Sequence, residues 1–246
     1  MHPRNRITVP IVMLHGIGIT NNAALQDWFI SKEAFRQLLD VIEKHRLATS
    51  HFADIAGRKG ETSGQVILSF DDCYKHLFDF AIPELVKRKM KAVFYMPTAH
   101  IGHYNTWDVD KGSQQFELMN GNDLRELARL GMEVGSHSHN HIDLRKADDK
   151  QLAEELLTSK QILEEITAHR VYSIAYPYGH VPAAYKSALP KAGYQYGVTI
   201  YHPFENNLAL RRFGVYEKDS AESLSKKLSV RYRWMRKVYD ALKKYD

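Results

Sequence analysis

The sequence predicts an α/β domain built on parallel strands, and three observations support this fold class. Short apolar runs alternate along the chain with longer segments of helical periodicity, which is typical of parallel βαβ units. The length of 246 residues matches the roughly 200–250 residues that an α/β barrel commonly needs for one domain. Apolar residues make up 44% and charged residues 26% of the chain, which excludes a disordered protein. We therefore expect residues 1–246 to form a single domain.

Seven apolar runs are the predicted strands. Each is short, continuous and rich in β-branched or aromatic residues, as expected for strands that are buried on both faces of a sheet. In chain order the runs are Val9–His15, Val66–Asp72, Ala92–Pro97, Met132–His137, Val171–Pro177, Tyr196–Tyr201 and Ala209–Val215.

Six segments between and after these runs have helical patterns. Ser31 and Asp148 are suited to cap two of the helices through their side-chain oxygens, and Gly131 is suited to end another. Pro83 would start or kink the second helix. The predicted helices cover 31–47, 76–89, 122–130, 148–167, 183–192 and a basic, aromatic C-terminal segment at about 220–244.

Charge and composition limit the classes of partner and location. No apolar run reaches the roughly 18 residues of a transmembrane helix. Pro10 and His15 interrupt the apolar stretch near the N-terminus, so we expect a strand there and no signal peptide, hence a cytoplasmic location unless a leader was removed. The net charge is only +5. The basic C-terminal helix could bind nucleic acid, but a packed amphipathic helix with a solvated basic face is the preferred interpretation, so no nucleic-acid partner is expected.

Polar residues cluster at the C-terminal ends of the predicted strands, where the active sites of parallel barrels lie. His15 ends the first strand and the adjacent pair Asp71 and Asp72 ends the second. Adjacent strand residues point to opposite sides, so one carboxylate could bind a metal while the other holds a proton. A strand-end turn that favours aspartate is the alternative for this pair taken alone.

The segment from His137 to His141 reads His-Ser-His-Asn-His and follows the fourth predicted strand. If it curls into a helical turn, His137 and His141 share a face and His139 points away; if it stays extended, all three imidazoles share a face. Two imidazoles and one carboxylate form an open metal site. The sequence therefore predicts a metal site here, with a polar loop as the alternative.

Three motifs in this order resemble those of the polysaccharide deacetylases, the NodB-homology or carbohydrate esterase family four enzymes. Ser69–Asp72 resembles the motif T-F-D-D, His137–His141 matches H-[ST]-x-x-H, and Ala175–Gly179 resembles R-x-P-Y-G. The resemblance covers roughly Ile11–Val215 and implies a distorted (β/α)7 barrel.

The resemblance also implies a role for each matching residue. Asp71 would be the general base. Asp72, His137 and His141 would bind a divalent metal ion, usually Zn²⁺. The backbone N–H of Tyr178 would contribute to an oxyanion hole, and the neighbouring Tyr176 and Pro177 would contact the substrate.

Two departures from the family pattern concern the groups that tune the reaction. Ala175 stands where many members have an arginine that orients the base, so that function must come from elsewhere, with Arg211 and Arg212 as candidates, or be absent. The usual C-terminal histidine is missing too, because no histidine follows Val215. The segment ending at His15 resembles the N-terminal histidine-bearing strand of a permuted branch that includes poly-N-acetylglucosamine deacetylases, which implies that His15 is the general acid.

The expected function is therefore metal-dependent removal of N-acetyl groups from an acetylated amino sugar or polysaccharide, with release of acetate. Two alternatives stay open: an amide hydrolase that acts on a small non-sugar substrate, and a catalytically silent carbohydrate-binding domain. Release of acetate from N-acetylated sugars would distinguish the expected function from the first alternative. A failure to bind metal would favour the second.

Overall fold

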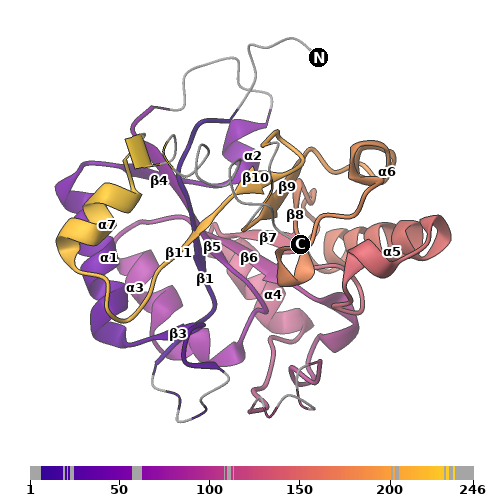
Figure 1. Cartoon of the computed structure of the whole chain (residues 1–246). Helices are drawn as coiled ribbons and strands as arrows, with labels where there is room; N and C mark the ends of the chain where they lie inside the picture. The colour runs from indigo at the N-terminus through magenta and orange to yellow at the C-terminus, as the bar shows by residue number, and fades with distance from the viewer. Residues whose placement is uncertain are drawn as a thin grey trace.

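The computed structural model describes residues 7–235 except 19, 21, 23–24, 57–62, 108, 110–111, 113, 201, 203–204, 230 and 233–234. Its centre is a parallel sheet that curls into a nearly closed barrel, with helices around the outside (Figure 1). In order along the sheet the strands are β10 (Leu210–Arg211), β9 (Tyr196–Thr199), β8 (Ser173–Ala175), β7 (Glu133–Ser136), β6 (Val93–Met96), β5 (Gln65–Phe70), β1 (Ile11–Leu14) and β11 (Phe213–Gly214).

The barrel closes through the last predicted strand, which is interrupted at Arg212. Its first half, β10, pairs with β9 and its second half, β11, pairs with β1. Counted as one interrupted strand, β10 and β11 bring the number of barrel strands to seven. Each lies within its predicted run except β5, which begins one residue earlier, at Gln65. The structure thus confirms the distorted (β/α)7 barrel and places Arg212 at its seam.

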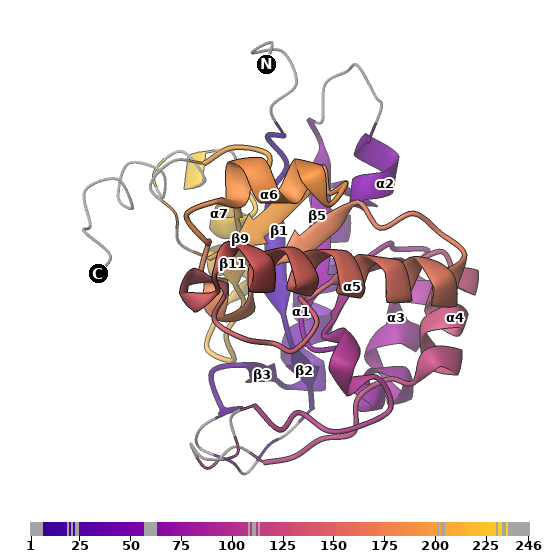
Figure 2. The same ribbon diagram turned by 90° about the vertical axis from the view of Figure 1, so that its right-hand side faces the viewer.

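Most of the predicted helices are confirmed with small changes at their ends. Ser31 caps the helix that begins at Lys32 by accepting a hydrogen bond from the N–H of Ala34, and Asp148 caps the helix that begins at Asp149 through the N–H of Gln151. Figure 2 shows the helices Asp149–Thr167 and Tyr185–Lys191 on the outside of the barrel. The helices are α1 (Lys32–Lys44), α3 (Ala81–Lys87), α4 (Gly121–Arg129), α5 (Asp149–Thr167), α6 (Tyr185–Lys191) and α7 (Ala221–Lys227).

Two predicted helices differ from the structure. The segment 76–89 is divided into a 3₁₀ turn at Lys75–Asp79 and α3, and Pro83 lies in the first turn of α3, where its missing N–H leaves no helical hydrogen bond unmade. A continuous helix over 220–244 is wrong, because α7 ends at Lys227 and the Ser229 hydroxyl accepts the N–H of Tyr232, as a residue that begins a new turn does. Residues 230, 233–234 and 236–244 of that prediction lie outside the described part of the chain.

Three short strands and one short α-helix were not predicted. β2 (Gly16–Ile17) and β3 (Phe29–Ile30) form a two-stranded sheet beyond the C-terminal end of β1. At the opposite end, β4 (Ala48–Ser50) pairs with the first half of β5 and leads into α2 (Phe52–Ile55). Phe52 of α2 stacks on Tyr196 at a ring distance of 4.9 Å, so an apolar floor closes the N-terminal mouth of the barrel.

The core has two parts that follow from the alternation of side chains along each strand. The larger cluster packs the sheet against the helices, and the smaller one joins inward-facing side chains such as Ile11, Ile67 and Val93 with Phe52 of the floor. Within the described residues, no helix combines the length and the apolar character needed to cross a lipid bilayer. The candidate site lies at the polar C-terminal mouth of the barrel.

Candidate active site

Three predicted metal ligands meet at the C-terminal mouth of the barrel. Asp72 follows β5, His137 directly follows β7, and His141 lies four residues farther along. The Nε2 atoms of His137 and His141 are each 3.6 Å from Oδ1 of Asp72, and one potential ligand atom from each residue lies within 4.8 Å of the others. All three residues are buried, so this group is enclosed rather than a surface cluster.

The chemistry of these three residues suits a divalent cation. Nδ1 of His137 is 2.8 Å from the carbonyl oxygen of Ala175, which can only accept, so Nδ1 carries the proton and Nε2 presents its lone pair toward Asp72. Burial lowers the pKa of His137. Burial, together with the repulsion that two protonated imidazoles would feel here, lowers the pKa of His141 well below its usual value. Neutral imidazoles and an ionised carboxylate form an N₂O donor set, which an ion between them would satisfy.

The loop that carries the histidines is neither a helical turn nor an extended strand. Ser138 has a left-handed φ of 64°, and its hydroxyl accepts the N–H of His141. From α5, a carboxylate oxygen of the buried Glu155 accepts the N–H groups of both His139 and Asn140. The imidazole of His139 instead contacts the hydroxyl of Thr98, with Nδ1 2.8 Å from Oγ1. The loop therefore directs His137 and His141 to Asp72 and His139 elsewhere.

Backbone strain is concentrated at this mouth of the barrel. Non-glycine residues with positive φ are uncommon, and each such conformation costs about 1–3 kcal/mol. Several of those in this protein belong to the site, namely Asp72 (69°), Cys73 (53°), Ser138 (64°), His141 (55°) and Tyr178 (60°).

Asp71 is held by Arg212, one of the two arginines that the sequence offered as candidates. Nη1 and Nη2 of Arg212 bond Oδ1 and Oδ2 of Asp71 at 2.6 and 2.7 Å. Burial alone would raise the pKa of Asp71, but the Arg212 guanidinium and His137 outweigh it and hold the pKa below its usual range. Arg211 turns away, with Nε 2.8 Å from the carbonyl oxygen of His202. Of the two candidates, Arg212 is thus the arginine that contacts Asp71.

His15 lies beside Asp71 at the end of β1. Its Nε2 is 3.8 Å from Oδ2 of Asp71, and its ring contacts that of Trp28 at a centroid distance of 4.9 Å. Burial lowers the pKa of His15 to about 4, against the opposing effect of Asp71. The imidazole is therefore neutral at neutral pH.

The residues of the motif Ala175–Gly179 differ in their exposure to the cavity. Tyr178 is 38% exposed and its ring meets His141 edge-on at 5.0 Å. Tyr176 is fully buried, lines the cavity, and donates its hydroxyl to the carbonyl of Leu208 at 2.6 Å. Pro177 is also buried, and its carbonyl accepts the N–H of His180. Pro177 is not among the residues that line the cavity.

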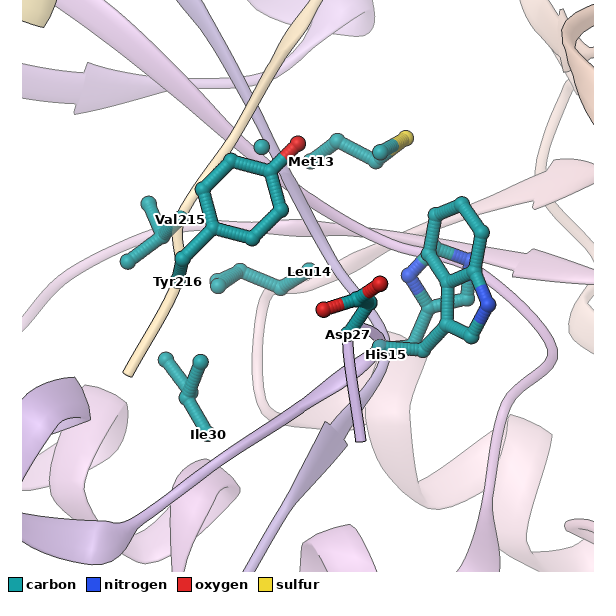
Figure 3. Close-up of a pocket in the computed structure, with 9 residues that line it drawn as sticks. Met13, Leu14, His15, Asp27, Ile30, Val215 and Tyr216 are labelled. Carbon is teal, nitrogen blue, oxygen red and sulfur yellow. The ribbon is translucent and has the colours of Figure 1, made fainter. Parts of the chain in front are cut away.

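One cavity unites these groups. It encloses about 750 Å³, including space open to solvent, and its wall includes His15, Asp71, Asp72, His137, His141, Tyr178 and Arg212. A smaller side cavity of about 270 Å³, again including space open to solvent, adjoins His15 and shares Met13, His15 and Trp28 with the first. Figure 3 shows this side cavity, with Asp27 and Tyr216 on its wall. His15 therefore forms part of the wall between two spaces.

Sequence reasoning missed several residues of the site, including Trp28, which lies beside His15. Glu155 lies within α5, Trp107 stacks on His141, and the buried Asn105 lines the cavity. Only the aromatic character of Trp28 and Trp107 was a usable signal, and aromatic residues are more often explained by core packing.

Comparisons with known proteins point to one family. A family model described as polysaccharide deacetylase matches residues 58–197. The protein YxkH of Bacillus subtilis is 29% identical over 151 residues, which cover 61% of this chain and 48% of that protein. A poly-β-1,6-N-acetyl-D-glucosamine N-deacetylase of Staphylococcus aureus is 23% identical over 193 residues, covering 74% of this chain and 64% of that protein. The chain thus spans about half to two thirds of the length of these relatives.

Solved structures share the fold. A polysaccharide deacetylase from Bacillus cereus has a TM-score of 0.75 at 24% identity, covering 90% of this chain and 69% of that one. A deacetylase from Streptococcus pyogenes in complex with acetate has a TM-score of 0.76 at 21% identity, covering 91% of this chain and 99% of that one.

Proposed function

The chain belongs to the polysaccharide deacetylase family, and from this premise we propose that it is a metal-dependent hydrolase that removes N-acetyl groups from an acetylated amino sugar or polysaccharide. The observation that carries the proposal is that the adjacent carboxylates of Asp71 and Asp72 have different partners. Asp72 faces two imidazoles, whereas Asp71 is clamped by a guanidinium. This division provides one ligand and one base at the same strand end.

Asp72, His137 and His141 would hold the ion, and the donor set of two imidazoles and one carboxylate favours Zn²⁺. When bound, such an ion polarises the amide carbonyl and lowers the pKa of a water molecule at its open position. The hydrogen bond from Nδ1 of His137 to the Ala175 carbonyl would keep Nε2 available as a ligand.

Asp71 would accept the proton of the attacking water. The bidentate contact with Arg212 keeps this carboxylate ionised and fixes its orientation. A carboxylate with a lowered pKa is a weak base, so the mechanism requires a water molecule that has itself been made more acidic.

His15 would deliver a proton to the leaving nitrogen. Because its pKa of about 4 leaves it neutral in the free protein, it must gain a proton during the reaction. The 3.8 Å separation between its Nε2 and Oδ2 of Asp71 offers a short path for the proton that Asp71 collects. That path would return the proton to the amine without an external acid.

The remaining parts of the cavity would bind the sugar and the developing oxyanion. The backbone N–H of Tyr178 would donate to the oxyanion, and its strained φ of 60° is consistent with a backbone held for that purpose. Trp28 and Tyr178, 40% and 38% exposed, line the cavity with aromatic surface on which sugar rings can stack. Tyr176 and Pro177 would support the position of Tyr178 from below rather than offer polar groups to the sugar.

The experiment that tests the proposal is release of acetate from oligomers of N-acetylglucosamine by the purified protein. We expect turnover that a chelator abolishes and added Zn²⁺ restores. His141→Ala should lose both metal and turnover, while the matched variant His139→Ala should keep the metal. A protein that binds no divalent metal, or one that deacetylates the oligomers equally well after complete metal removal, would contradict the proposal.

A further inference from the structure

We propose that Trp107 is a positioning residue that orients the imidazole of His141 for metal binding. This inference rests on the proposed metal site and concerns how that site is built. Trp107 lies on the segment between β6 and α4, far in sequence from the three ligands.

The two histidines of the site are held in different ways. Nδ1 of His137 has a hydrogen-bond partner in the Ala175 carbonyl, which fixes the rotation of its ring. Nδ1 of His141 is buried and finds no hydrogen-bond partner among the residues that the structure describes. The bond from the His141 N–H to Ser138 fixes the backbone but leaves the ring free to rotate. Some other contact must therefore set the direction of its Nε2.

Aromatic contacts supply that constraint. The Trp107 ring stacks on the His141 ring at a centroid distance of 4.1 Å and an angle of 25°. Tyr178 meets the same imidazole edge-on, at 5.0 Å and 69°. An imidazole packed against an indole face and a phenol cannot tilt about its Cβ–Cγ bond without separating these surfaces. These contacts hold the ring in the plane in which its Nε2 lies 3.6 Å from Oδ1 of Asp72.

Trp107 is itself anchored. The side chain of the neighbouring Asn105 is buried and uses both ends of its amide, donating to the carbonyl of Gln114 and accepting the N–H of Phe116. Trp107 also meets His100 edge-on at 5.0 Å. The indole is thus held in place and can orient the His141 ring by packing. Metal-binding histidines are more often oriented by a hydrogen bond to the second ring nitrogen.

The alternative is that Trp107 contacts only the substrate, since it also lines the cavity. A measurement of metal affinity, which needs no substrate, distinguishes the two roles. A positioning residue changes the affinity for the metal, whereas a residue that only binds sugar leaves that affinity unchanged and raises KM.

The test is a titration of the metal-free protein with Zn²⁺ against a competing chelator, together with the visible absorption spectrum of the Co²⁺-loaded protein. Trp107→Ala should bind Zn²⁺ about 10–100-fold more weakly, the usual effect of losing a group that orients a ligand, and should change the Co²⁺ spectrum. Trp107→Phe, which keeps a stacking ring, should recover most of the affinity. Trp28→Ala is the matched control, because Trp28 contacts His15 rather than a ligand, and it should bind Zn²⁺ as the wild type does.

Each outcome decides the question. Wild-type affinity and an unchanged Co²⁺ spectrum in Trp107→Ala would overturn the inference while leaving the metal site intact. If Trp107→Ala does not fold, Trp107→Leu replaces it as a ringless apolar variant, and wild-type affinity in that variant would overturn the inference equally. A wild-type protein that binds no metal would instead refute the proposed function.

Discussion

Replacing Arg212 with alanine should destabilise the protein at neutral pH and shift its activity toward higher pH. Both effects have one cause. The side chains of Asp71 and Arg212 are 4% and 1% exposed, so Asp71 would become a buried carboxylate without its partner cation. Removing one member of a buried, hydrogen-bonded ion pair costs about 3–5 kcal/mol, and we expect a loss of that size in the free energy of unfolding.

The pH dependence of this loss has a defined sign. In the wild type the pKa of Asp71 lies below its unfolded value, so the pair stabilises the protein above the ordinary pKa of aspartate and this contribution disappears as the pH falls into the acid range. Without the guanidinium, burial raises the pKa of Asp71, and the carboxyl takes up a proton at higher pH. The stability deficit of Arg212→Ala should therefore shrink as the pH is lowered, and the acid limb of kcat/KM should move upward.

Urea denaturation at neutral and at mildly acidic pH, combined with a pH profile of kcat/KM, measures both effects. Arg211→Ala is the matched control, because Arg211 is the adjacent buried arginine but bonds to the His202 carbonyl. The double variant Asp71→Asn, Arg212→Ala should recover part of the lost stability, since no unpaired charge remains. An acid limb that does not move in Arg212→Ala, with a stability loss no larger than that of Arg211→Ala, would refute the reasoning.

Three further predictions concern single side chains of the site. Asp72→Asn should lose metal and turnover together, whereas Asp71→Asn should retain metal but lose about 10²–10⁴-fold in turnover; equal loss of metal in both, by metal analysis, would contradict the division of roles. His15→Ala should keep fold and metal and slow amide hydrolysis by about 10²–10⁴-fold, with a smaller effect on an activated ester; equal losses on both substrates would remove His15 from the acid role. Glu155→Gln should weaken Zn²⁺ binding, because one of the two Glu155 carboxylate oxygens that accept hydrogen bonds from the histidine loop is replaced; an unchanged affinity in a chelator titration would show that the loop keeps its conformation without these bonds.

The positions of the three proposed ligands could be predicted because they depend on local patterns. Each follows an apolar run whose periodicity marks it as a buried strand, and parallel strands bring their C-terminal ends to one mouth. The conformation between His137 and His141 could not be predicted, because it depends on a left-handed Ser138 and on the carboxylate of Glu155, which reaches the loop only after α5 has packed on the barrel.

The choice between Arg211 and Arg212 was undecidable from sequence for a similar reason. Alternation along one regular strand would place one of the two arginines inward. This strand, however, is interrupted between β10, which pairs with β9, and β11, which pairs with β1, so alternation does not predict which arginine points inward. The short elements β2, β3, β4 and α2 escaped prediction because segments of two to four residues carry too little periodicity to detect. Trp107 was missed because a single loop aromatic has no pattern at all.

The seam at Arg212 also has a consequence for the order in which the protein can fold. The pairing of Val12 with Phe213 joins the two ends of the barrel, and contacts between such distant parts of a chain have a high entropic cost and form slowly. Asp72 follows β5, and His137 and His141 follow β7. Only β6 lies between these two strands in the sheet, so a partly folded chain could assemble the ligand set first. Asp71 would receive its guanidinium only when the last strand docks. An intermediate with an open barrel would then hold a metal yet remain hydrolytically silent until closure.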